Sequence, residues 1–147
     1  MTCILVDTCV FMRLEGIFIT TLDCILVTTD VIAITKKIIK EYEGRAKGVL
    51  FFLQSFLQKL EHEGKLKYFD SSFIESAVRR HENVRRINYP THNKDRKWVR
   101  IAIATKSKYI VSTDPHLLRL ASNRCNSDTI EAIEPSQYVM IRCPNNN

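Results

Sequence analysis

The chain has 147 residues, of which 45% are hydrophobic, and its formal net charge is +6 at pH 7. This length fits one domain with a single core, which we place at residues 1–142, with a disordered tail at 143–147. The positive charge favours a polyanionic partner. No apolar run approaches the length of about 18 residues that a membrane span requires, so we expect no membrane partner.

The five cysteines form no C-x-x-C pair and no Cys/His cluster with zinc spacing. An odd number of cysteines cannot all pair within one chain. The first residues also lack the pattern of a secretory signal, because the apolar run there is short and is broken by Asp7. We therefore expect reduced thiols in a cytoplasmic protein.

Short apolar runs alternate with segments of helical spacing. The runs that predict strands are 3–6, 24–29, 65–69, 109–112 and 129–135. The segments that predict helices are 31–44, 45–64, 72–87, 95–108 and 115–122. This alternation is typical of an α/β fold with a mainly parallel sheet.

Four acidic residues occupy positions that such a fold can bring together. Asp7 and Asp114 follow the apolar runs 3–6 and 109–112, and ligand crevices of open parallel sheets lie at the carboxyl ends of the strands. Asp95 begins the helix that leads into the second of these runs. Glu41 is late in a helix that runs away from the crevice. Whether its side chain lies near the other acids depends on helix packing, which the spacing of residues in the sequence does not show.

Four carboxylates in one crevice repel each other unless a cation lies between them. Mg²⁺ and Mn²⁺ prefer such oxygen ligands, and phosphodiester hydrolysis is the chemistry that joins such a site to an anionic substrate. The alternative is structural, because Asp95 and Asp114 both suit helix N-caps and Pro115 suits the first helical position. For Asp114, capping and metal binding are compatible.

Four stretches of the chain resemble, in order, the motifs of PIN-domain ribonucleases. They are "ILVDTCVFMRL" (4–14), "IIKEYEG" (38–44), "DRKWVRIAIATKSKYIVSTDPHLL" (95–118) and "IEAIEPSQYV" (130–139). The group they resemble most is the VapC-like toxins of toxin–antitoxin pairs. The resemblance implies a three-layer α/β/α sandwich, PIN-like, around a central and mainly parallel sheet of about five strands.

The resemblance also implies a metal-dependent endoribonuclease that acts on RNA. The cofactor would be Mg²⁺ or Mn²⁺. Its ligands would be Asp7, Glu41, Asp95 and Asp114. Ser112 would orient a metal-bound water or Asp114 itself, and Thr8 matches the hydroxyl residue that follows the first acid. For the toxin group, the resemblance further implies an antitoxin partner and a homodimer.

Three positions depart from the family pattern. Cys9 replaces the usual Asn or Ser, which weakens hydrogen bonding near Asp7. Thr113 replaces Gly or Arg, and His116 replaces an acid that would add a fifth carboxylate. None of these departures removes a core acid.

Residues 76–108 contain ten Lys or Arg against two acids, Glu82 and Asp95. The plain interpretation is two amphipathic helices with solvated basic faces. As a group, these residues suit a surface that follows RNA phosphates, especially beside the first helical acid. The predicted RNA contacts are Arg96, Lys97, Arg100 and His116.

Two rival functions stay open. One is a catalytically silent PIN-fold module that binds RNA or protein. The other is an acid-rich phosphohydrolase for small phosphate esters. Against the second, the D-x-D pair with which one such class begins is missing, because "DTC" offers only Asp7.

Overall fold

The computed structural model describes residues 2–12, 15–46, 48–125 and 128–144. One sheet contains the six strands of these ranges: β1 (Cys3–Val6), β2 (Val31–Ile34), β3 (Leu66–Tyr68), β4 (Tyr109–Val111), β5 (Asn123–Cys125) and β6 (Asp128–Ile133). The helices of the same ranges are α1 (Thr8–Phe11), α2 (Ile17–Val27), α3 (Lys36–Arg45), α4 (Leu50–His62), α5 (Ser71–Glu82), α6 (Arg96–Thr105), α7 (Pro115–Leu118) and α8 (Pro135–Arg142). A 3-10 turn, η1 (Asn93–Asp95), precedes α6.

The strand order in the sheet is β3-β2-β1-β4-β6-β5. All neighbours are parallel except β5 and β6, which are antiparallel. The chain therefore proceeds outward from β1 through β2 to β3, and then returns to the other side of β1 with β4. The point where the direction reverses lies between β1 and β4, and this is where open α/β sheets bind ligands.

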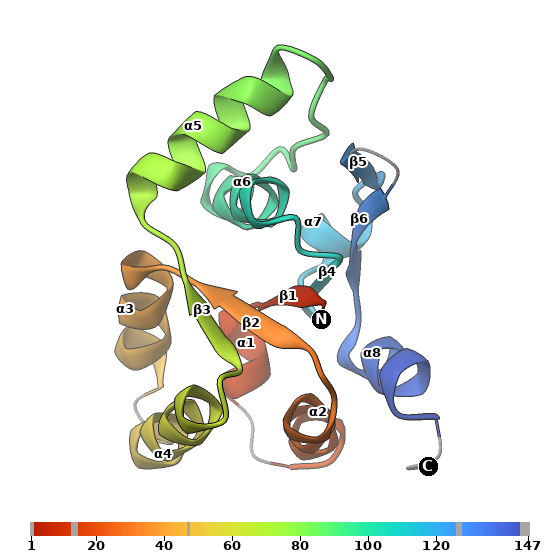
Figure 1. Cartoon of the computed structure of the whole chain (residues 1–147). Coiled ribbons are helices and arrows are strands. Elements are labelled where there is room, and N and C mark those ends of the chain that lie inside the picture. The colour runs from red at the N-terminus through yellow and green to blue at the C-terminus, as the bar shows by residue number, and fades with distance from the viewer. Residues whose placement is uncertain (1, 13–14, 47, 126–127, 145–147) are drawn as a thin grey trace.

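Helices cover both faces of the sheet (Figure 1). In that view α6 and α7 lie above the sheet, with α5 outside α6, and α1 to α4 and α8 lie below it. Crossover connections between parallel strands are right-handed, so a reversal of direction along the sheet moves the connecting helices to the opposite face. The reversal after β3 thus explains why α5 and α6 lie on the face opposite to α3 and α4.

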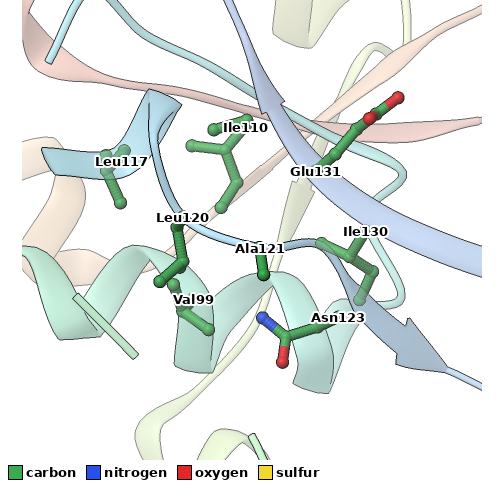
Figure 2. Close-up of a pocket in the computed structure, with 9 residues that line it drawn as sticks. Val99, Ile110, Leu117, Leu120, Ala121, Asn123, Ile130 and Glu131 are labelled. Atoms are coloured by element: carbon green, nitrogen blue, oxygen red, sulfur yellow. The ribbon is translucent and has the colours of Figure 1, made fainter. Parts of the chain in front are cut away.

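The central strands are almost completely buried, as strands covered on both faces must be. Helix α6 adds Trp98, Val99 and Ala102 to this core. Between α6, α7 and the β4–β6 side of the sheet, the packing leaves a cavity of only about 10 Å³ (Figure 2). This layer is close-packed and has no space for a ligand.

The α/β class and the mostly parallel sheet are confirmed. The strand predicted at 24–29 is wrong, because these residues include the second half of α2, and the following β2 was assigned to the start of a helix. A short apolar run fits a buried helix as well as a buried strand, so periodicity alone cannot separate the two. The short edge strand β5 and helix α8 were not predicted.

The C-terminal region is fastened to α2. Cys143, expected to begin a disordered tail, is buried and forms a disulfide with Cys24, whereas residues 145–147 of that tail lie outside the described ranges. The expectation that all thiols are reduced is therefore wrong for this pair, and the cytoplasmic location stays a prediction. Within the ranges described, no helix is long and apolar enough to cross a membrane.

Candidate active site

Asp7 and Asp114 lie at the carboxyl ends of the adjacent strands β1 and β4. The register pairs Val6 with Val111, and the backbone N–H of Asp7 donates to the Val111 carbonyl at 2.9 Å. The Ser112 hydroxyl donates to Asp7 Oδ2 at 2.6 Å and accepts from the Asp114 backbone N–H at 2.9 Å. Ser112, which is fully buried, thus fixes both acidic turns to each other.

Asp114 is also the N-cap of α7. Its Oδ1 accepts from the His116 backbone N–H at 2.9 Å, and Pro115 occupies the first turn. The predicted cap is confirmed. It places the carboxylate of Asp114 at the end of β4, beside the other acids, because the cap residue is where the strand gives way to the helix.

Asp95 is the N-cap residue of α6, but its side chain makes no capping hydrogen bond. Asp95 thus occupies the predicted cap position, but its carboxylate does not cap the helix by a hydrogen bond. Burial, the charge of Asp114 and that of Asp7 raise the pKa of Asp95 above its usual value. A side-chain hydrogen bond with Asp114 is another of the effects that raise the pKa of Asp95.

Glu41 reaches the same region from α3. It accepts a hydrogen bond from the Thr8 hydroxyl and forms an ion pair with Lys97 of α6. The next residue, Tyr42, is fully buried and donates to the Val6 carbonyl, which holds α3 against the end of β1. Burial by itself raises the pKa of Glu41, but the hydrogen bonds from Lys97 and Thr8 outweigh it and lower that pKa.

The acids influence one another electrostatically. Burial raises the pKa of Asp7, the charges of Glu41 and Asp114 add to this effect, and the hydrogen bond from Ser112 opposes it. Asp7, Asp95 and Asp114 thus act on one another, and Glu41 acts on Asp7; we call the four predicted acids, Asp7, Glu41, Asp95 and Asp114, the carboxylate cluster. A cation within it would relieve the repulsion.

The chemistry of this donor set fits Mg²⁺ or Mn²⁺, which prefer carboxylate oxygens and keep several waters. Across the described ranges, no three His, Cys, Asp or Glu side chains are already arranged to hold a metal ion. Glu41 is engaged by Thr8 and Lys97, so the three aspartates form the centre of the cluster and Glu41 its border.

The predicted RNA contacts differ in their surroundings. Arg96 is exposed and lies over the Tyr89 ring, 5.8 Å from its centroid. His116 is exposed and packs against His92, with ring centroids 5.3 Å apart. Arg100 is turned toward α5 and pairs with Glu75 at 2.6 Å, so the structure does not place it at the acids. Lys97 forms an ion pair with Glu41 of the cluster, and the backbone N–H of His116 donates to Asp114.

Two departures from the family pattern contact each other. The Thr113 hydroxyl donates to Cys9 Sγ at 3.2 Å. Burial raises the pKa of the Cys9 thiol, and the charge of Asp7 raises it further. Cys9 is therefore a protonated, poorly nucleophilic thiol beside the cluster.

A groove beside the cluster was missed at the level of sequence. It has a volume of about 710 Å³ and is lined by residues of α3, β3, α5 and α6, including Lys36, Lys37, Tyr68 and Lys97. The two adjacent lysines directly after β2 were the available signal. Because residues 31–34 were assigned to a helix, these lysines were not placed at the carboxyl end of a strand.

Comparison with protein-family models gives no match to this chain, and neither a curated protein nor a solved structure matches it.

Proposed function

We propose that this protein is a PIN-like endoribonuclease that depends on Mg²⁺ or Mn²⁺. The observation that supports the proposal is the carboxylate cluster at the reversal point of the sheet, in a protein of net charge +6. Like charges near one another at the carboxyl ends of the strands are costly for stability, and a bound cation would offset this cost.

In this proposal the three aspartates and Glu41 hold the metal. Bound there, Mg²⁺ or Mn²⁺ would supply a more acidic water and would neutralise charge on the phosphate. Ser112 keeps Asp7 and Asp114 in a fixed relation, and Thr8 orients Glu41. Lys97, beside Glu41, offers a cation to the phosphate of an incoming RNA strand.

The direct test is the replacement of single acids. We expect Asp7→Asn and Asp114→Asn to reduce cleavage of single-stranded RNA by at least about a thousandfold, because each removes a negatively charged metal ligand. Cleavage is followed on gels with purified protein in Mg²⁺ or Mn²⁺. Asp23→Asn, on the exposed surface of α2, is the matched control and should cleave like the wild type.

Undiminished cleavage by the Asp114→Asn protein, free of contaminating nuclease, would remove this residue from the mechanism. Circular dichroism of each variant shows whether a lost activity reflects a lost fold. Addition of EDTA to the wild type should stop cleavage, and excess Mn²⁺ should restore it.

A second candidate is the catalytically silent module. It is favoured by the ion pair between Lys97 and Glu41, which already neutralises one acid. This candidate predicts RNA binding that survives EDTA, with no cleavage stimulated by metal.

The role of toxin, with an antitoxin partner and a homodimer, is a narrower form of the first proposal. A short reading frame that overlaps the gene would support it. Its absence would favour RNA processing or decay.

A further inference from the structure

The groove of about 710 Å³ borders the carboxylate cluster on the side of α3 and α5. Its apolar floor comprises the buried side chains of Ile38, Ile74 and Ile101. Lys97 both lines this groove and pairs with Glu41. Lys97 is therefore the residue that the groove has in contact with the cluster.

The groove carries excess positive charge. Its lining contains four cationic side chains and two anionic ones, namely Lys36, Lys37, Lys97, Arg100, Asp70 and Glu75. Both acids already have partners, because Asp70 accepts from the Phe73 backbone N–H and Glu75 pairs with Arg100. No salt bridge of the described residues includes Lys36 or Lys37, which are exposed at the start of α3. These two lysines are the cations that an anionic ligand would meet.

Aromatic rings line the same groove at the end of β3, the strand that pairs with β2 just before the lysines. Tyr68 lines the groove and is 52% exposed, so its ring is accessible to a ligand. Phe69 is half-buried and packs against Phe73, with ring centroids 5.3 Å apart. An exposed ring next to cations is the combination with which proteins bind unpaired bases and their phosphates.

We propose that this groove binds a nucleotide of single-stranded RNA next to the phosphate that is cut. Lys36 and Lys37 neutralise its phosphate, and Tyr68 stacks on its base. The choice of a single strand follows from the stacking, because bases within a duplex do not present their faces. This inference rests on the proposed function in that it takes the carboxylate cluster as the place of cleavage.

The test measures binding and does not depend on cleavage. The probe is a hexauridylate with a 5′ fluorescein, titrated in EDTA and followed by fluorescence anisotropy. We expect Lys36→Gln/Lys37→Gln to lower the affinity about tenfold and to reduce its salt dependence, since two phosphate-neutralising charges are lost. Tyr68→Ala should lower the affinity about fivefold for the single strand and leave binding of a duplex unchanged.

The matched control is Lys59→Gln/Lys108→Gln. It removes the same charge from α4 and from the amino end of β4, and both side chains are exposed. We expect its affinity to stay within about twofold of the wild type. An equal loss of affinity in the two double variants would overturn the proposal that the groove binds RNA, because it would show that the RNA is attracted by overall charge alone.

A covalent readout locates the base. Hexauridylate that contains 5-iodouridine is irradiated with the wild-type protein, and the crosslinked peptide is identified by mass spectrometry. Crosslinks at Tyr68 or Phe69 support the groove, and crosslinks confined to other residues overturn it. Displacement of the RNA by an acidic peptide at equal concentration would also overturn it, in favour of a protein ligand.

Failure of the groove and failure of the proposed function give different results. If the groove variants lose affinity as expected while Asp114→Asn still cleaves, the binding subsite stands and the catalytic assignment falls. If Asp114→Asn stops cleavage while the groove variants bind normally, the nuclease stands and the groove does not hold the strand.

Discussion

Asp7 combines burial with two charged neighbours of the same sign. Its pKa is raised by burial and by Glu41 and Asp114, so ionised Asp7 opposes folding when no metal is bound. A carboxyl group whose pKa is higher in the folded than in the unfolded state holds more protons when folded. Its contribution to the free energy of unfolding is therefore present at low pH and is lost as pH rises above its usual value of 3.8.

We accordingly expect metal-free Asp7→Asn to be more stable than the wild type at neutral pH. The difference should vanish as pH falls toward 3.8, where the wild-type carboxyl group is protonated as well. Urea denaturation in EDTA between pH 4 and pH 8 measures it, with Asp23→Asn as the exposed control. An Asp7→Asn variant that is less stable than the wild type over this whole pH range would show that the Asp7 carboxylate stabilises the fold.

The same pair of proteins tests the metal without any assay of activity. A ligand that binds only the folded state stabilises it, by about 2.7 kcal/mol when its concentration is a hundred times the Kd. This stabilisation raises the melting temperature. Mg²⁺ or Mn²⁺ should therefore raise the melting temperature of the wild type and leave that of Asp7→Asn nearly unchanged. Equal shifts in both proteins would place the ion elsewhere.

At the scale of elements, α8 is held to α2 and β2 by polar contacts as well as by packing. Asp30, which directly precedes β2, is fully buried. Its carboxylate accepts two hydrogen bonds from the Arg142 guanidinium, at 2.7 and 2.9 Å, and one from the Tyr138 hydroxyl at 2.7 Å. A buried carboxylate that loses its cation keeps its full desolvation cost.

Arg142→Met should therefore lower the free energy of unfolding by roughly 2–3 kcal/mol. The value lies below that for a fully buried pair because Tyr138 keeps its hydrogen bond and the arginine is partly exposed. Urea denaturation measures it, with the exposed Arg119→Met as control. In Asp30→Asn/Arg142→Met the loss should be smaller, since no buried charge is left behind. An equal loss in both variants would mean that arginine packing, and not charge, is what matters.

A helix or strand could be predicted from the sequence where its own residues determine it, and could not where its packing against distant residues does. Asp7 and Asp114 were found because each follows a short apolar run that suits a buried strand and is one in the structure. The interval 24–34 was misassigned because two apolar runs adjoin there, and the division into α2 and β2 depends on what each packs against. The contact of Glu41 with Lys97 joins two helices that are distant in sequence, so spacing along one helix cannot reveal it.

At the scale of the whole molecule, the disulfide joins Cys24 to Cys143, which are separated by 119 positions. A crosslink around so long a loop restricts the unfolded chain strongly, which is worth about 4–5 kcal/mol in the chain-entropy description. Reduction should lower the free energy of unfolding by up to this amount, as measured by urea denaturation with and without dithiothreitol. Cys24→Ala/Cys143→Ala should not respond to the reductant. A wild type that is equally stable in both conditions would contradict the crosslink.

The strand order also determines when the site can exist. The first strand of the chain, β1, is central in the sheet, and its partner β4 is made late in translation. Asp95 and Asp114 emerge from the ribosome long after Asp7 and Glu41, so a nascent chain that ends before them has only half of the acids. If the proposed activity holds, any polypeptide that stops before Asp95 has only Asp7 and Glu41 of these four acids and should not cleave RNA.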